Sequence, residues 1–365
     1  MLTTNYYQPW LFPFLSFRKT SVSPGIIRYA YHSFEDGLWD LLQQYALPRG
    51  SVILVPDFYC MDVIDNIRHH GYRPVFYPLD DNFQIRPDRL YRFVRRYSPG
   101  VIIIFHACGI RSMTVHKPSW MRALPKETII IEDCVHRLLD PSTVTIRRST
   151  HYVMDSLRKV SPLPGSHMYT RKKLPNVTKR YSVFNRYAIA SAGYYVLFRL
   201  LFVTAMTFRS ARLIRFAHTN ILKKHDDIIG DRFVPTRGFG WASWFLDRFD
   251  FKRIERHKAR QVTLYRTYLS ALAHPFYGIR IPKQDYGKLH VYPLGFCKTP
   301  DPSLIRYLHR HGVVVWYKFP DAPWSKNRGV LFLPLGFHVT DAHIRHIAGH
   351  LSAWQTAKRE TALYS

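Results

Sequence analysis

Short apolar runs alternate with amphipathic stretches over the first half of the chain. Apolar residues recur at helical spacing in residues 61–70, which end before Gly71, and in residues 87–97, which end before a Ser-Pro-Gly turn. Runs suited to buried strands occupy residues 51–55, 73–77, 101–105, 128–132 and 151–154. Repeated strand–helix–strand units predict an α/β fold, with a mostly parallel sheet and helices on both faces.

A helix is predicted ahead of the first of these strands. Ser33 and Asp36 have the spacing of a capping box, in which a hydroxyl precedes an acid by three residues. Leu38, Leu41 and Tyr45 then follow at helical spacing. The sequence therefore predicts that this helix leads into the sheet.

The remainder of the chain predicts a smaller α+β unit. Residues 247–273 have the pattern of a long, charged amphipathic helix. Further strands are predicted at 291–296 and 313–316, and further helices at 302–311 and from residue 340. Because 365 residues exceed what one simple core suits, we predict an N-terminal arm (1–24), a large domain (25–245) and a small C-terminal domain (246–365).

The stretch 187–208 is long and apolar but contains Arg199. A central arginine is costly inside a bilayer, which disfavours a membrane span. A helix on a membrane surface is an alternative, since Arg209, Arg212 and Arg215 follow and could meet lipid headgroups. We favour a third interpretation, a helix packed inside the protein or against a partner subunit.

The chain is strongly basic, with a net charge of +28. Such a charge attracts nucleic acid, anionic lipid or phosphorylated substrates, and a surface adapted for solubility would explain it equally well. No compact basic arm, zinc finger or RNP-type motif is present, so no specific nucleic-acid partner is predicted. The aromatic content of 15% and hydrophobic content of 47% indicate a packed globular protein.

The four cysteines show no metal-binding or disulfide spacing, and we predict no metal site. The N-terminus shows no basic region followed by an apolar stretch and a cleavage site. We therefore expect a cytoplasmic protein with reduced thiols, which would sit at the inner face of the membrane if residues 187–208 contact lipid.

Reactive side chains gather where the predicted strands end. In open parallel sheets, ligands bind beyond the carboxyl ends of the strands. Each of these side chains alone has an ordinary structural explanation, such as helix capping or solvation, but their shared location favours a site. The residues are Tyr59, Cys60, His106, Asp133, His136, Ser156 and Lys159.

One chemistry uses such a set particularly well. A lysine amine can form an imine with pyridoxal phosphate (PLP). A carboxylate keeps the pyridine nitrogen protonated, so that the ring withdraws electrons from the substrate. Burial and a nearby cation would lower the pKa of the lysine and free its amine.

These residues also lie in motifs that resemble those of the DegT/DnrJ/StrS family of fold-type-I PLP enzymes, best known as nucleotide-sugar aminotransferases. The resemblance covers roughly residues 25–352, and its most specific part is a Glu-Asp-x-x-His motif with a downstream lysine. The matching stretches are Val52 to Cys60, Gly71 to Phe76 with Leu79-Asp80, Ile104 to Gly109, Ile130 to His136, Asp155 to Lys159 and Pro164-Gly165. The resemblance implies a fold-type-I PLP-transferase fold, in which a large domain is followed by a small α+β domain.

The resemblance also implies roles. Lys159 would bind the cofactor covalently, Asp133 would contact the pyridine nitrogen, and His136 would flank the ring or its phenolic oxygen. Ser156 would contact the phosphate, Tyr59 or Cys60 would lie against the ring, and His106 belongs to the family's strand-end His-x-x-Gly motif.

Two departures from the family pattern concern the phosphate. Ser33-Phe34-Glu35 stands where the family has Ser-Gly-Thr, and acids at this helix end would compete with a phosphate. The family also sends an asparagine from the partner subunit; here residues 236–240 lack one, and Arg237 is our candidate for that role in a homodimer.

Three functions are compatible with the sequence. The first is a PLP-dependent aminotransferase acting on an anionic, nucleotide-linked keto sugar with glutamate or a similar amino donor, in glycan, polysaccharide or secondary-metabolite biosynthesis. The second is another PLP reaction on the same fold. The third is a catalytically lapsed PLP-fold protein that serves as a binding or membrane-associated component. We favour an enzyme, because both Asp133 and Lys159 are present.

Overall fold

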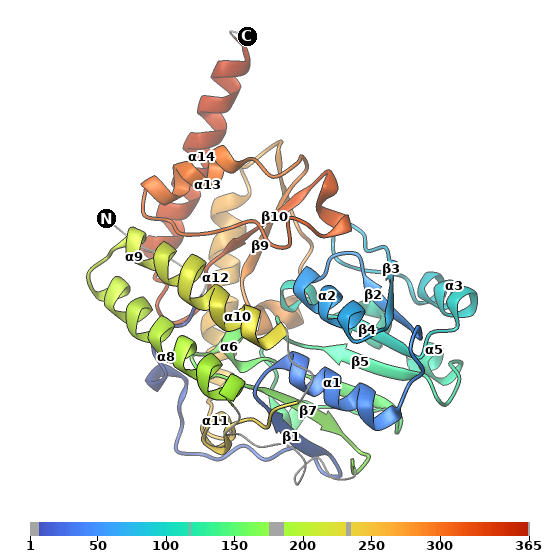
Figure 1. Cartoon of the computed structure of the whole chain (residues 1–365). Coiled ribbons are helices and arrows are strands. Elements are labelled where there is room, and N and C mark those ends of the chain that lie inside the picture. The colour runs from blue at the N-terminus through green and yellow to red at the C-terminus, as the bar shows by residue number, and fades with distance from the viewer. Residues whose placement is uncertain (1–6, 117, 175–185, 231–234, 364–365) are drawn as a thin grey trace.

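A computed structural model of the chain describes residues 7–116, 118–174, 186–230 and 235–363 (Figure 1). It confirms an α/β fold around a seven-stranded, mostly parallel sheet with the order β1-β7-β6-β5-β4-β2-β3. Strands β2 to β6 run parallel, and β7 is antiparallel to both β6 and β1. The strands are β1 (Ile27–Tyr31), β2 (Val52–Pro56), β3 (Arg73–Tyr77), β4 (Val101–Phe105), β5 (Ile129–Asp133), β6 (His151–Met154) and β7 (Ser166–Thr170).

The central strands are apolar because both of their faces are covered. Every residue of β2, β4, β5 and β6 is buried, which explains their unbroken apolar runs. In the ladder, Phe105 pairs with Asp133, and Asp133 pairs with Met154. The carboxyl ends of β4, β5 and β6 are therefore level, so the loops that leave them meet at one edge of the sheet.

The strand order also changes direction beside β2, since β3 lies on one side of β2 and β4 on the other. Such a switch point opens a crevice at the carboxyl ends of the strands, where ligands bind in this class of fold. The loop after β2 begins at this switch point and carries Tyr59 and Cys60.

The helices predicted beside the first three strands are confirmed. Helix α1 begins after Ser33, whose Oγ accepts a hydrogen bond from the backbone N–H of Asp36, as the capping box predicts. The helices of this part of the chain are α1 (Phe34–Tyr45), α2 (Met61–His69), α3 (Pro87–Tyr97), α4 (Met113–His116), α5 (Pro118–Arg122) and α6 (Leu157–Val160).

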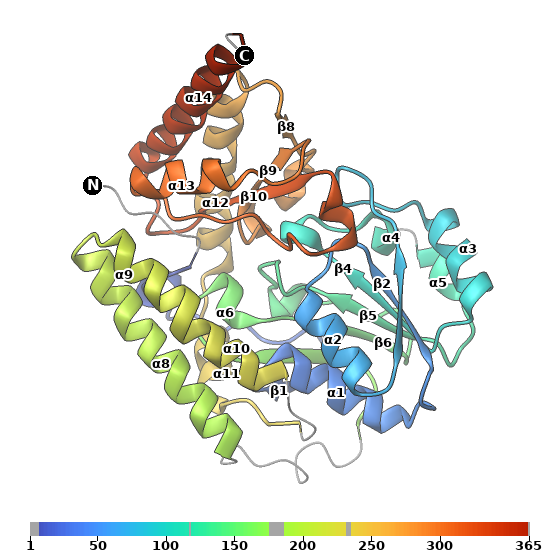
Figure 2. The ribbon, with the colours of Figure 1, turned by 45° about the horizontal axis from the view of Figure 1, so that its top comes forward.

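A helical hairpin lies along the outside of the molecule. Helix α8 (Arg186–Thr207) forms the first arm. Helix α9 (Ala211–Phe216), a π-helical stretch (Ala217–Leu222) and α10 (Lys223–Gly230) return beside it (Figures 1 and 2).

One face of α8 packs on the protein and the other is exposed. By length and composition α8 could cross a membrane. Only 28% of its most apolar stretch is buried inside the protein. The predicted packing inside the protein is confirmed for the inner face only. No element of the described residues covers the outer face, and its packing against a partner subunit stays a prediction. The buried residues are Ala188, Ser191, Tyr195, Phe198, Phe202 and Ala205.

The second part of the chain forms a small antiparallel sheet with helices around it, at the top of Figure 1. Its strands have the order β10-β9-β8. The seven-stranded sheet ends before residue 245 and the three-stranded sheet starts after it, although the domain limits themselves remain a prediction. The elements are α11 (Gly240–Leu246), α12 (Phe251–Leu269), β8 (Phe276–Gly278), β9 (Tyr292–Phe296), α13 (Pro302–Arg310), β10 (Gly329–Leu333) and α14 (Asp341–Leu363).

The strand predicted at residues 313–316 is wrong. Val313, Val314 and Val315 are fully buried, which explains the apolar pattern, but they form no ladder. The segment instead runs past β10 through separate contacts, such as the hydrogen bond from Phe332 N to the Trp316 carbonyl. Its path brings the next residues of the chain, 318 and 319, close to the carboxyl ends of the large sheet's strands.

Candidate functional site

Asp133 is the last residue of β5, and its side chain is 1% exposed. Its Oδ2 accepts a 2.6 Å hydrogen bond from the Tyr59 hydroxyl, and its Oδ1 accepts one from the Val135 backbone N–H at 2.9 Å. In the part of the chain that the structure describes, no cationic side chain forms an ion pair with it. Burial therefore raises the pKa of Asp133 to about 7, although the two hydrogen bonds lower it.

Lys159 lies in α6, directly after β6, where Ser156 is the N-cap residue. Burial first, and then the positive charges of Arg158 and Lys318, lower the pKa of Lys159 to about 7. A substantial fraction of its amine is thus uncharged at neutral pH. An uncharged amine is what nucleophilic attack on a carbonyl carbon requires.

Tyr59 and Cys60 both belong to this site, in different ways. Tyr59 is buried and donates its hydroxyl proton to Asp133, while its ring stands edge-on to Phe105 at 5.2 Å. Cys60 is the N-cap residue of α2, and burial raises the pKa of its thiol to about 11. Lys318 and Lys159 act on that pKa in the opposite direction, which shows that the thiol lies near both ammonium groups.

His136 is buried where the two sheets meet. Its ring lies parallel to that of Phe319, with the ring centroids 5.7 Å apart, and it also contacts Phe105 and Phe332. Burial lowers the pKa of His136 well below its usual value, and nearby positive charges add to this effect. A neutral imidazole here can accept or donate a hydrogen bond without adding charge.

Lys318 and Phe319, from the segment after residue 316, complete this side of the site. The Lys318 Nζ lies 4.6 Å from the centre of the Phe319 ring. Burial lowers the pKa of Lys318, and the charge of Lys318 affects Lys159, His136 and Cys60. The small domain thus contributes a second amine whose charge lowers the pKa of Lys159.

The structure does not bring His106 to Asp133. His106 Nε2 lies 2.8 Å from Glu132 Oε1, and its Nδ1 accepts a hydrogen bond from Ser112 N. Neighbouring residues of a strand point to opposite faces, so Glu132 and His106 lie on the face away from Asp133. His106, Glu132 and Cys134 have ligand atoms within 4.8 Å of one another. The hydrogen bonds of His106 and Glu132 account for this cluster as a buried polar network.

The N-terminus of α1 does not fit a phosphate. Ser33 Oγ donates to Asp36 Oδ2 at 2.6 Å, and Asp36 Oδ1 accepts from Thr236 N at 3.0 Å. Glu35 stands in the same turn, and its charge raises the pKa of Asp133. The chain therefore supplies its own negative charges to the positive end of this helix.

Arg237 lies close to this helix end through its backbone. It forms an isolated bridge with Tyr31, two residues before Ser33, and its side chain is exposed. The structure contains one chain, so the prediction that Arg237 reaches into a partner subunit stays a prediction.

Arg158 and Asp226 link the site to the helical hairpin. Arg158 Nη1 lies 2.8 Å from Asp226 Oδ1, on α10. Burial would raise the pKa of Asp226, but Arg158 and Lys159 outweigh it and the pKa is lowered. The charge of Asp226 in turn raises the pKa of Lys159, so this acid limits the loss of positive charge from the amine.

The cofactor that the resemblance implies can be tested against these groups. A buried carboxylate without a cation would gain one from a protonated pyridine nitrogen, so Asp133 fits the ring. The uncharged fraction of the Lys159 amine fits covalent attachment to an aldehyde. The usual phosphate position at α1 does not fit, so Ser156 and Lys318 are the groups near Lys159 that would hold the phosphate.

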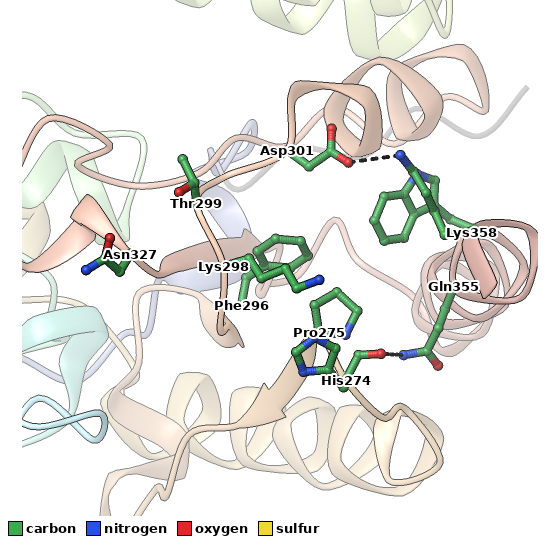
Figure 3. A pocket seen from close by; sticks show the side chains of 10 residues that line it. His274, Pro275, Phe296, Lys298, Thr299, Asp301, Asn327, Gln355 and Lys358 are labelled. Atoms are coloured by element: carbon green, nitrogen blue, oxygen red, sulfur yellow. Dashed lines mark hydrogen bonds and ion pairs between the residues drawn. The ribbon is translucent and has the colours of Figure 1, made fainter. Parts of the chain in front are cut away.

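A separate hollow of about 850 Å³ lies in the small domain (Figure 3). It is lined by residues between 274 and 358 and shares none with the cluster around Lys159. Asp301 and Lys358 on its rim form an ion pair at 3.3 Å, and Gln355 donates to the His274 carbonyl at 3.1 Å. Because these polar groups pair with one another, we place the chemistry at the strand ends.

Sequence reasoning missed Lys318, Phe319, Arg158 and Asp226. Asp226 is followed by Asp227, which pairs with Lys223 at helical spacing, so the local pattern resembles an ordinary solvated face. Lys318 and Phe319 come after a run that has the pattern of a strand. No local signal distinguishes these residues, because long-range packing places them.

No family profile and no curated relative matches the chain. Solved structures do match its fold. DesI, determined with its TDP-sugar product, is 16% identical, with 92% of this chain and 82% of that chain covered and a TM-score of 0.59. NtdA from Bacillus subtilis, with bound PMP, is 14% identical over 89% of this chain and 72% of that chain, with a TM-score of 0.55.

A third structure is a DegT/DnrJ/EryC1/StrS aminotransferase from Brucella abortus. It is 14% identical, covers 90% of this chain and 86% of its own, and has a TM-score of 0.52. At these identities the likeness concerns the fold. The chain therefore adopts the fold-type-I PLP-transferase fold that these aminotransferases share.

Proposed function

We propose that the protein is a PLP-dependent aminotransferase that acts on a nucleotide-linked keto sugar, with glutamate or a similar amino acid as donor. The observation that carries the proposal is that Asp133 and Lys159 stand at the carboxyl ends of the neighbouring strands β5 and β6, with the pKa of each moved to about 7, mainly by burial. Opposed shifts of this kind mark catalytic sites. The fold shared with an enzyme solved with a TDP-sugar product supports the substrate class.

When bound, PLP supplies an aldehyde and an electron-withdrawing pyridine ring. Asp133 would hold a proton on the ring nitrogen, oriented by the Tyr59 hydroxyl and the Val135 N–H. Lys159 would hold the cofactor through its Nζ, and the same amine would move a proton to and from the substrate. His136 would lie beside the ring as a neutral hydrogen-bonding group.

The positive charges near Lys159 suit an anionic substrate. Arg158 and Lys318 are the basic groups whose charges lower the pKa of Lys159, and the whole chain carries +28. A field of this sign raises the local concentration of a diphosphate-linked sugar and speeds its encounter with the site. We infer that Lys318 serves the substrate as well as the cofactor phosphate, since it comes from the small domain that covers the site.

The test uses the purified protein incubated with PLP. The bound cofactor should turn the protein yellow, and borohydride reduction followed by peptide mapping should place the label on Lys159. A Lys159→Arg variant keeps the charge and serves as control, because it should stay colourless. Label on another lysine, or no label with PLP in excess, would refute the assignment.

A second candidate is a catalytically lapsed PLP-fold protein with a binding role. The arrangement of Ser33, Glu35 and Asp36 at the end of α1 favours it, because this helix end is already neutralised. The same PLP experiment separates the two functions. A protein that stays colourless while folded and stable would have lost the cofactor.

We further propose that the enzyme works in the cytoplasm as a homodimer, with Arg237 close to the subunit boundary. The resemblance to fold-type-I enzymes and the exposed position of Arg237 support this proposal. Light scattering should give twice the mass of the 43.1 kDa chain. A monomer that is yellow and active would contradict it.

A further inference from the structure

The outer face of α8 carries an apolar stripe, with the exposed Arg186 at its start beside Tyr187. We name the exposed apolar residues at its surface the outer stripe; their exposed fractions lie between 42% and 76%. Exposed apolar side chains gathered on one face of a soluble protein mark contact surfaces. The residues of the outer stripe are Tyr187, Ile189, Val196, Leu197, Leu200 and Phe208.

The one charged residue between Tyr187 and Phe208 points away from this stripe. Arg199 Nη2 donates hydrogen bonds to the carbonyls of Gln8 at 2.6 Å and Pro9 at 2.9 Å. The arginine is thus satisfied by the N-terminal segment on the protein side of α8. Arg199 would therefore not have to enter the membrane if the outer stripe contacted lipid, so it adds little to the free-energy cost of that contact.

The inner face of α8 holds the helix on the protein. Phe198 and Phe202 pack against the Tyr7 ring, with centroids 5.3 and 6.1 Å apart. Ser191 bonds to His225 on α10 at 2.8 Å. Crossing a bilayer would break these contacts, so the outer stripe suits contact with a membrane surface and not a span.

The turn and second arm of the hairpin carry exposed basic residues that directly follow Phe208 of the outer stripe in the sequence. Arg209, Arg212 and Arg215 are exposed and form no ion pair among the described residues. Phe216, 49% exposed, lies next to Arg215. Apolar and aromatic side chains can enter the boundary between lipid headgroups and acyl chains, and cationic side chains can contact the lipid phosphates.

We propose that the hairpin α8–α10 docks on an anionic membrane surface. The outer stripe enters the boundary between headgroups and acyl chains, and Arg209, Arg212 and Arg215 contact lipid phosphates. The charge of these arginines favours lipid over a second copy of the chain, because a two-fold interface here would bring the same cations together. The docking does not depend on the proposed reaction.

Flotation with vesicles tests the proposal. The full-length protein should float with vesicles of phosphatidylcholine and phosphatidylglycerol at low salt, and much less with phosphatidylcholine alone. Each arginine near the surface contributes about 1 kcal/mol, which is about fivefold in partitioning. The double variant Arg212→Gln, Arg215→Gln should therefore bind about 25-fold more weakly.

A matched control removes two charges elsewhere. Arg92 and Arg95 are exposed on α3, on the far side of the molecule from α8 (Figure 1). The variant Arg92→Gln, Arg95→Gln changes the net charge equally and should bind vesicles within twofold of the parent. A third variant, Val196→Ser with Leu200→Ser, should lose the part of the binding that survives moderate salt, since both residues lie in the outer stripe.

Three results would overturn the proposal. The parent protein could fail to float with anionic vesicles. The α3 control could weaken binding as much as the α9 pair, which would show attraction by net charge alone. The outer-stripe variant could leave vesicle binding unchanged while turning a dimer into a monomer by sedimentation, which would assign this face to a second copy of the chain.

Discussion

Replacing Asp133 by asparagine should stabilise the cofactor-free protein at alkaline pH and impair its function. The carboxyl has an ordinary pKa of 3.8 and a folded-state pKa of about 7. The unfolded chain therefore releases this proton first as pH rises, and the folded state loses stability between about pH 4 and pH 7. Asparagine has no proton to release, so the variant escapes this loss.

The structure allows both sides of the change to be estimated. Each pH unit between the two pKa values removes about 1.4 kcal/mol, so the full penalty on the parent protein above pH 7 is about 4 kcal/mol. Asparagine has a single acceptor oxygen, so it cannot serve both the Tyr59 hydroxyl and the Val135 N–H as the carboxylate does, which costs about 1–2 kcal/mol. The variant should be less stable than the parent at pH 4 and more stable by about 2 kcal/mol at pH 8.

Urea unfolding of the cofactor-free protein at pH 4, 6 and 8 measures this difference. Glu132→Gln, one residue earlier on β5, is the matched control with the opposite sign. Burial would raise the pKa of Glu132, but His106 and His151 lower it well below its usual value. This control should therefore be destabilised most at pH 8 and least at pH 4. A stability difference for Asp133→Asn that is the same at all three pH values would refute the reasoning.

The functional effect of Asp133→Asn should have the opposite sign. An amide cannot hold the charge of a protonated ring nitrogen, and a contact of this kind contributes about 3 kcal/mol, or roughly a hundredfold in rate. Single-turnover rates with an amino donor at pH 8 would show the loss. An unchanged rate would mean that another group faces the ring nitrogen.

Three further predictions concern the groups around Lys159. The rate at which PLP labels Lys159 should rise with pH around a midpoint of about 7, because that is where its amine loses its proton; a midpoint near the ordinary value of 10.5 would contradict the burial of this amine. Asp226→Asn should move this midpoint to lower pH, since Asp226 raises the pKa of Lys159, and an unmoved midpoint would exclude that coupling. Glu35→Gln should strengthen PLP binding about fivefold in a fluorescence titration, because about 1 kcal/mol of repulsion between the Glu35 carboxylate, whose charge also acts on Asp133, and the cofactor phosphate is removed. Equal or weaker binding would show that the charge of Glu35 does not act on the bound phosphate.

The sequence predicted β2 to β6, and four of these strands, β2, β4, β5 and β6, are buried on both faces; it missed β1 and β7, the antiparallel pair at one edge of the sheet. Runs such as residues 101–105 have no polar interruption, so their type and limits are visible locally. The same kind of apolar run led to a wrong strand prediction at residues 313–316, because a buried segment that pairs with no strand has the same apolar pattern. Apolar character reports burial, and only the pairing partner distinguishes a strand from a packed extended segment.

The candidate site was predictable in its centre and not at its borders. Asp133 ends β5 and Lys159 follows β6, and these two strands are neighbours in the sheet. Successive side chains of a strand point to opposite faces of the sheet, and this alternation separates His106 and Glu132 from Asp133. Lys318 and Asp226 come from elements distant in the chain, and their approach to Lys159 depends on how those elements pack.

The ion pair between Arg158 and Asp226 has a practical consequence for anyone who trims the protein. Residues 186–230 look like a removable appendage, and excising them would be a natural route to a more soluble version. The excision would also leave the Arg158 guanidinium without its carboxylate, next to Lys159. The Lys159 amine would then lose its proton at a lower pH than in the full-length protein. A truncated enzyme would thus report altered chemistry even if its fold were intact, so activity lost with the hairpin would say nothing about membranes.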